Sequence, residues 1–263
     1  MNILDKIVAQ KTKEVEIKKS LTPVKELVHS IYFNMPCVSM KDSITAPGKS
    51  GIIAEFKRQS PSKGIINDKA DVEQTTVGYT EAGASALSVL TDKYFFGGDN
   101  TDLLAARKVN SIPILRKDFT IDEYQIIEAK SIGADAVLLI AAILDKEKIK
   151  NFSALAHKLG LQVLLEIHNK EELSVICDDI DMVGVNNRNL KDFTVSIQTS
   201  IDLADKIPDN FVKISESGIS NPENIIELKK YGFQGFLMGE NFMKTGNPAK
   251  ACGKFISEIS VIR

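Results

Sequence analysis

Residues 136–168 read AVLLIAAILDKEKIKNFSALAHKLGLQVLLEIH, and this stretch decides the fold. Apolar runs at 136–142 and 162–168 flank a segment, 146–160, in which charged and apolar residues follow helical spacing up to Gly160. Short apolar runs with little alternation are typical of parallel strands covered on both faces. Glycine commonly follows the last residue of a helix. The stretch therefore predicts a strand, a helix and a second strand.

The same unit recurs along most of the chain. Strand-like runs lie at 51–57, 86–92, 112–118, 136–142, 162–168, 182–187, 211–217 and 235–239. Helical stretches alternate with them at 72–84, 101–109, 121–134, 146–160, 170–178, 196–207 and 221–232. The interval of about 26 residues is usual for one unit of a (β/α)8 barrel. We therefore predict an α/β fold, a (β/α)8 TIM barrel in one domain spanning 1–263.

An open, doubly wound sheet is the alternative, because sequence does not show whether the sheet closes. No GxGxxG motif follows the first apolar run, which argues against the dinucleotide-binding form of that fold. Residues 1–46 differ from the repeat. Their apolar residues, among them Ile3, Ile7 and Val15, are interspersed with Lys and Glu, which predicts an N-terminal extension of one or two amphipathic helices.

The composition excludes several function classes. Among 263 residues, 33 Lys and Arg against 35 Asp and Glu give a net charge of −2, which provides no field for nucleic acid or a membrane surface. No run reaches the roughly 18 apolar residues of a membrane span, and the N-terminus does not read as a signal peptide. Three widely spaced cysteines and scattered histidines predict neither disulfides nor a metal site. We expect a cytoplasmic protein and, with the oligomeric state left open, a monomer.

Polar side chains stand where the apolar runs end. In a barrel, the carboxyl ends of the strands meet at one mouth, where this fold places its chemistry. Any one such residue is ordinary at a strand end. Charges inside runs as apolar as LLEIH (164–168) are costly unless paired or used, so together they indicate a functional site. Such residues end six of the runs: Glu55 and Lys57, Thr91 and Asp92, Lys117 and Asp118, Glu166 and His168, Asn186, Asn187 and Arg188, and Ser215, Glu216 and Ser217.

Glycine-containing turns follow the last two strands. Ser217-Gly218 follows the seventh strand, and Gly239-Glu240 follows the eighth. In barrels, these two loops hold phosphate with backbone N–H groups and a short helix. We therefore expect a phosphorylated small-molecule substrate at these four residues.

The stretch IAEFKRQSPSKG (53–64) resembles the signature ExKxxSPSxG of the indole-3-glycerol phosphate synthase family. Further segments similar to the family lie at 90–98, 115–119, 165–168, 184–190 and 215–219. The resemblance covers nearly the whole chain. It implies an enzyme of tryptophan biosynthesis that converts 1-(2-carboxyphenylamino)-1-deoxyribulose 5-phosphate into indole-3-glycerol phosphate, carbon dioxide and water, with no cofactor.

The resemblance also implies roles for single residues. Lys117 is the general acid that protonates the substrate carbonyl during ring closure, and Glu166 is the general base of the later dehydration. Lys57 holds the substrate carboxylate and is available to donate a proton. Three residues orient these groups and the substrate hydroxyls: Glu55, Asn186 and Glu216.

The remaining implied contacts are with the phosphate and the aromatic ring. Arg188, Ser60 and the amides near Gly218, Gly239 and Glu240 surround the phosphate, where the Glu240 carboxylate repels the anion and only its backbone N–H helps. The ring needs an apolar wall, for which the candidates are Phe95, Phe96, Phe119 and Leu138. As in the family, the N-terminal extension is expected to cover the mouth, and loop 58–67 to act as a mobile lid.

Elementary chemistry agrees with these roles. A positioned ammonium makes a carbonyl more electrophilic by proton donation, and carboxylates such as Glu55 and Glu216 keep Lys117 charged. Loss of carbon dioxide restores aromaticity, so the step needs no electron-sink cofactor. Desolvation in an apolar strand is expected to raise the pKa of Glu166 and make it a better base.

Other functions remain open. One is a different phosphate-binding barrel enzyme, such as a sugar-phosphate isomerase or an aldolase that forms a Schiff base on Lys117. Phosphoribosylanthranilate isomerase is a nearer alternative, but it relies on a Cys and Asp pair, and no cysteine here ends a strand near the mouth. A barrel that binds without catalysis is the alternative outside enzymes. The combination of Lys57, Lys117 and Glu166 argues against it.

Overall fold

The sheet of the computed structural model, which describes residues 3–189 and 193–261, is a closed barrel of eight parallel strands. Leu190, at the end of one segment similar to the family, lies outside the described residues. The strands are β1 (Ile52–Phe56), β4 (Ala86–Leu90), β5 (Ile114–Lys117), β6 (Ala136–Ile140), β7 (Gln162–Ile167), β8 (Met182–Asn186), β9 (Val212–Glu216) and β10 (Phe233–Met238). Because β1 pairs with both β4 and β10, the predicted barrel is confirmed and the open sheet is wrong.

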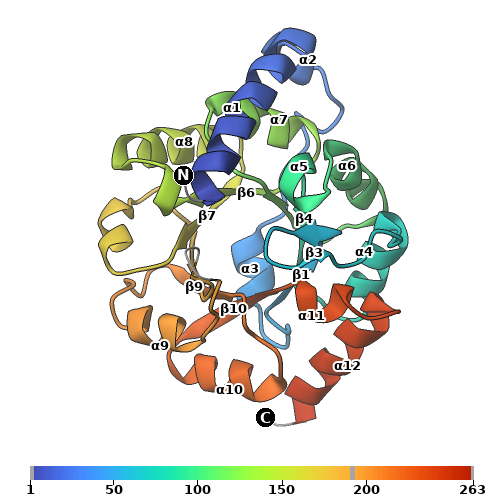
Figure 1. The fold of residues 1–263 in the computed structure, drawn as a ribbon, viewed down its shortest axis with the longest axis vertical. Coiled ribbons are helices and arrows are strands. Elements are labelled where there is room, and N and C mark those ends of the chain that lie inside the picture. The colour runs from blue at the N-terminus through green and yellow to red at the C-terminus, as the bar shows by residue number, and fades with distance from the viewer. Residues whose placement is uncertain (1–2, 190–192, 262–263) are drawn as a thin grey trace.

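Helices surround the ring of strands (Figure 1). They are α4 (Val72–Glu81), α5 (Lys93–Phe96), α6 (Asn100–Val109), α7 (Glu123–Ser131), α8 (Lys146–Lys158), α9 (Gln198–Ala204), α10 (Pro222–Lys230), α11 (Glu240–Met243) and α12 (Pro248–Val261). Side-chain caps fix several starts, as where Asn221 accepts from the N–H of Asn224 just before Pro222. Among the described residues, no helix is long and apolar enough to cross a membrane.

The helix predicted at 170–178 is wrong. This segment forms only a short 3-10 turn, η2 (Glu171–Val175), and a similar turn, η1 (Ala141–Ile143), follows β6. The side chains of Asn169 and Glu172 bond to each other and to nearby backbone N–H groups, which closes the turn locally. Such local bonds compete with a helix ladder.

Alternation along each strand sorts the side chains into two apolar layers. Residues that point inward, such as Ile53, Leu138 and Leu164, fill the barrel, while their neighbours pack under the helices. The same rule separates two adjacent cations. Lys117 faces the barrel mouth, whereas Arg116 lies outside the sheet and donates to Glu128 on α7.

Three helices precede the barrel: α1 (Ile3–Leu21), α2 (Val24–Leu27) and α3 (Met40–Thr45). Helices α1 and α3 reach its two ends, and α2 packs against α7. Helix α3 closes the amino-terminal end, where the backbone N–H of Met40 donates to the side chain of Gln162 at the start of β7. Met40 and Ile44 are buried among barrel residues. The start of α1 reaches the opposite end, which is the mouth.

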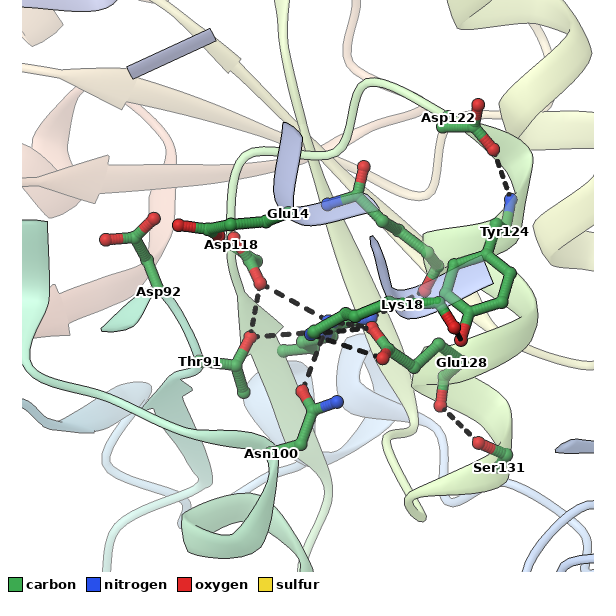
Figure 2. A network of polar contacts seen from close by, with 12 residues as sticks. Glu14, Lys18, Thr91, Asp92, Asn100, Asp118, Asp122, Tyr124, Glu128 and Ser131 are labelled. Atoms are coloured by element: carbon green, nitrogen blue, oxygen red, sulfur yellow. Dashed lines mark hydrogen bonds and ion pairs between the residues drawn. The ribbon is translucent and has the colours of Figure 1, made fainter. Parts of the chain in front are cut away.

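A buried cluster of charges anchors α1 to the barrel. Lys11 is only 3% exposed, and its Nζ lies 2.7 Å from Asp92 and 2.9 Å from Asp118. Figure 2 shows the continuation of this cluster, in which Thr91 donates to Asp118 and Lys18 pairs with Glu128 at 3.2 Å. Two acidic residues that end strands β4 and β5 are thus used to hold the N-terminal helix.

Replacing Lys11 with methionine is expected to detach α1. The change leaves Asp92 and Asp118 buried without their cation, and breaking a buried pair this way costs about 3–5 kcal/mol. Amide exchange over Ile3–Leu21 should become fast, and urea denaturation should show lower stability. Lys13→Met is the matched control, because Lys13 is exposed on the same helix. Equal protection of α1 in both variants would contradict this anchoring.

Candidate active site

A cavity of about 400 Å³ opens at the carboxyl end of the barrel. This volume falls within the usual range of small-molecule sites, about 300–1,000 Å³. All six predicted catalytic residues line it: Glu55, Lys57, Lys117, Glu166, Asn186 and Glu216. Loop residues 60–63 and the start of α1, including Leu4 and Ile7, form part of its wall.

Lys117 is held between two carboxylates at the centre of the cavity. Its Nζ lies 3.0 Å from Glu166 Oε2 and 2.5 Å from Glu216 Oε2. Asn186 donates to the other oxygen of Glu166 at 3.1 Å, and the backbone N–H of Arg188 in turn holds the Asn186 side chain. The three strands β5, β7 and β9 therefore bring one ammonium and two carboxylates into contact.

This contact sets the protonation of the three groups. Burial lowers the pKa of Lys117, but Glu166, Glu216 and Glu55 outweigh it, so the ammonium holds its proton more tightly than usual. Burial raises the pKa of Glu216, Lys117 offsets part of this, and the charges of Glu166 and Glu55 bring the pKa to about 7. Of these groups, Glu216 is therefore the one whose carboxyl titrates near neutral pH.

The expected rise in the pKa of Glu166 is wrong for this structure. Burial acts in the predicted direction, but Lys117, His168 and Asn186 stabilise the ionised form and lower the pKa below its ordinary value. Loss of the Lys117 proton would remove one of these interactions and raise the pKa of Glu166. The protonation of Glu166 is thus coupled to that of Lys117.

Lys57, directly after β1, forms a second ion pair in the cavity. Its Nζ lies 2.7 Å from Glu55 Oε1, and the hydroxyl of Ser88 lies 3.4 Å from the other Glu55 oxygen. Among the described residues, Glu55 is the one carboxylate that pairs with Lys57, whereas Lys117 pairs with two. Lys57 therefore lies in the cavity wall with its ammonium positioned by Glu55.

The residues predicted to bind phosphate come from the ends of β8, β9 and β10 and from the 58–67 loop after β1. Ser60, Arg188, Ser217, Gly218, Gly239 and Glu240 all line the cavity. Ser217 and Gly218 have φ values of 66° and 74°, a left-handed conformation that is strained for serine and recurs at ligand sites. The Glu240 carboxylate lies 3.5 Å from Arg188 and 3.6 Å from Lys63.

The apolar wall differs in one residue from the prediction. Phe119 and Leu138 line the cavity, as does Phe96, whereas Phe95 is not among its lining residues. Phe95 sits against the ring of Tyr94, with 5.0 Å between centroids. Helix α5 begins at Lys93 with Asp92 as its cap, and this start turns Phe96 rather than Phe95 toward the cavity.

Several lining residues were not among the predicted site residues. Lys63 lies in the quoted 53–64 stretch, and its charge was the only signal for it. Asp118, Phe193, Val195 and Lys244 also line the cavity. Phe193, Val195 and Lys244 come from segments whose path the strand pattern does not predict, whereas Asp118 ends the apolar run at 112–118. The three cysteines lie elsewhere: Cys252 is buried in α12, and Cys37 contacts Lys130.

Two glycines leave room for the carboxylates. A Cβ at Gly184 would clash with Oε1 of Glu216 and lie 3.1 Å from Leu164, and one at Gly239 would lie 2.6 Å from Glu55 Oε1. Gly184→Ala should therefore push Glu216 off Lys117, lower kcat, and cost about 1–3 kcal/mol through overpacking. Gly246→Ala is the control, because a Cβ there meets nothing within 4 Å. Equal kcat and thermal stability in the two variants would contradict the predicted clash.

The fold and the site together define a (β/α)8-barrel enzyme with a lysine–carboxylate centre at its mouth. The family model for indole-3-glycerol phosphate synthase matches residues 4–255, and the chain belongs to this family.

Proteins of this family from other organisms align with this chain over nearly its full length. A protein of Bacteroides thetaiotaomicron named indole-3-glycerol phosphate synthase is 50% identical over 258 residues, 98% of this chain and 99% of that protein. One of the same name from Thermoanaerobacter pseudethanolicus is 43% identical over 261 residues, 97% of this chain and 98% of that protein. A chain from the tryptophan synthase complex of Pyrococcus furiosus superimposes with a TM-score of 0.59 at 18% identity, covering 81% of this chain and 98% of that one. This likeness concerns the fold.

Proposed function

We propose that the cavity at the barrel mouth is where this chain carries out the reaction of its family. The chain is a carboxy-lyase of tryptophan biosynthesis that forms indole-3-glycerol phosphate from 1-(2-carboxyphenylamino)-1-deoxyribulose 5-phosphate. The observation that carries the assignment to this cavity is the contact of Lys117 with both Glu166 and Glu216 inside it.

In the proposed first step, Lys117 donates a proton to the substrate carbonyl oxygen while the aromatic carbon bonds to the carbonyl carbon. Proton donation from a positioned group makes the carbonyl more electrophilic. The carboxylate leaves as carbon dioxide, and its bonding electrons restore the aromatic ring. Lys57 holds this carboxylate beforehand, and Glu55 holds Lys57 in place.

In the second step, the hydroxyl formed from the carbonyl leaves as water. Glu166 removes a proton from the adjacent carbon, and an ammonium in the cavity supplies the proton to the leaving oxygen. Lys117 has by then given up its proton, so one of the charges that lower the pKa of Glu166 is gone. Glu166 therefore becomes a stronger base after Lys117 has given its proton to the carbonyl, and dehydration follows ring closure.

The remaining contacts position the substrate. Arg188 and the turn at Ser217 and Gly218 are proposed to hold the phosphate, with Ser60 closing from the other side. Glu240 keeps its carboxylate on nearby cations, so its backbone N–H is the part that serves the anion. Phe96, Phe119 and Leu138 are proposed to contact the anthranilate ring.

We further propose that the chain acts as a single domain and a monomer in the cytoplasm, with residues 1–46 as its N-terminal extension. The 58–67 loop, which forms the hairpin of β2 (Gln59–Ser60) and β3 (Gly64–Ile65), is proposed to act as its lid. Lid opening is a common limit on turnover.

The direct test is incubation with the carboxyphenylamino sugar phosphate while indole fluorescence is followed. Formation of indole-3-glycerol phosphate is expected. A sugar-phosphate isomerase or a binding barrel would leave this substrate unchanged. An aldolase would instead be inactivated by borohydride in the presence of its substrate, through reduction of a Schiff base on Lys117.

A further inference from the structure

His168 lies between two carboxylates that face different cavities. Its Nε2 lies 3.2 Å from Glu166 Oε1, and its Nδ1 lies 3.3 Å from Glu172 Oε2. Glu166 lines the cavity described above, whereas His168 and Glu172 line a second cavity beside it. The imidazole therefore lies on the side of Glu166 that faces away from the active-site cavity.

The two oxygens of Glu166 have different partners. Oε2 accepts a hydrogen bond from Lys117, while Oε1 accepts one from Asn186 and lies next to His168. When Lys117 gives its proton to the substrate, only Oε2 loses its partner. Oε1 stays held, so Oε2 is the oxygen left to take a proton.

The turn η2 fixes the far side of His168. Glu172 Oε2 accepts from the backbone N–H of His168 at 2.8 Å, and Glu172 Oε1 accepts from Asn169 at 2.8 Å. The carboxylate of Glu172 therefore cannot rotate freely. The 3-10 turn η2, which stands where a helix was expected, therefore fixes the position of His168.

We propose that His168 is a positioning residue for the general base. Locked by Glu172, it places a positive charge against Oε1 of Glu166, so that the carboxylate keeps its orientation and Oε2 alone faces the reacting carbon. The inference rests on the proposed function, in which Glu166 is that base.

The charge state of His168 agrees with this role. Burial lowers its pKa, but Glu166 and Glu172 outweigh burial and raise the pKa to about 10. The other charges near Glu166 are those of Lys117 and Glu216. Because His168 is one of the groups that lower the pKa of Glu166, its loss should raise that pKa.

The test compares His168→Ala with His168→Gln in steady-state kinetics across pH. We expect kcat to fall by about tenfold or more in His168→Ala, since a general base contributes about 10²–10⁴ in rate and is here misaligned. KM should stay within about twofold, because His168 does not line the active-site cavity. Both variants should move the acidic limb of the kcat profile to higher pH. Glutamine, which fills the space without charge, should restore part of kcat.

A second pair of variants tests the lock. Glu172→Gln removes the carboxylate that holds His168 and should lower kcat in the same manner, while Glu171→Gln, one residue away on the exposed face, should not. Thermal unfolding of each variant shows whether it is folded. An unchanged acidic limb in the two His168 variants would overturn the inference. Absence of product with the wild-type chain would instead refute the proposed function.

Discussion

Replacing Lys117 with methionine is expected to lower kcat by about 100- to 10,000-fold, the range of a general acid. Methionine keeps the length of the side chain but neither its charge nor its proton. Ring closure should stop, so neither carbon dioxide nor indole fluorescence should appear. The measurement is single-turnover kinetics with both readouts. Lys170→Met, at an exposed position after β7, is the control.

The same variant should change the pH dependence of stability. Lys117 depresses the pKa of Glu166, and a depressed carboxylate contributes stability above its unfolded pKa of about 4.3 that is lost as pH falls. Without the ammonium, the share of this contribution that comes from Lys117 disappears, while His168 and Asn186 keep theirs. The difference in unfolding free energy between wild type and Lys117→Met should therefore shrink in acid. Turnover near the wild-type value would remove Lys117 from the mechanism.

Replacing Glu166 with glutamine is expected to block the reaction at a later point. Glutamine keeps the shape and can still bond to Asn186, but it accepts no proton. Ring closure and decarboxylation depend on Lys117, so a first turnover should release carbon dioxide. Dehydration should then fail, and overall kcat should fall by about 100- to 10,000-fold.

Quenched-flow analysis checks this outcome by comparing carbon dioxide with indole-3-glycerol phosphate in the first turnover. An excess of carbon dioxide is expected. Glu171→Gln, which is exposed in the turn after β7, serves as the control. Product formed in equal amount to carbon dioxide, at the wild-type rate, would exclude Glu166 as the base.

The sequence predicted the barrel because eight apolar runs alternate with helical stretches, and the resemblance to the family singled out the six catalytic candidates among the polar residues at the ends of those runs. The position of Glu55, Lys117, Glu166 and Glu216 near the ends of apolar runs was enough to place them at one mouth. Position near the end of an apolar run was less informative about the polar residues next to these four. Asn187 and Ser215 also end strands, but they point outward and bond to Ser200.

What the sequence did not predict depends on tertiary contacts. The pKa of Glu166 falls because Lys117 lies 3.0 Å away, a distance set by the pairing of distant strands. Lys11 looked like one of many charges on an exposed helix, yet it is buried against Asp92 and Asp118. The rotation of α5, which chooses Phe96 over Phe95, likewise follows from its cap at Asp92.

The most direct test of the account is a crystal structure of Lys117→Met with the intact carboxyphenylamino sugar phosphate bound. The account predicts that the phosphate contacts the turn at Ser217 and Gly218, the carboxylate contacts Lys57, and the carbonyl oxygen lies beside the methionine. A substrate bound outside this cavity, or one whose carbonyl lies far from position 117, would contradict it.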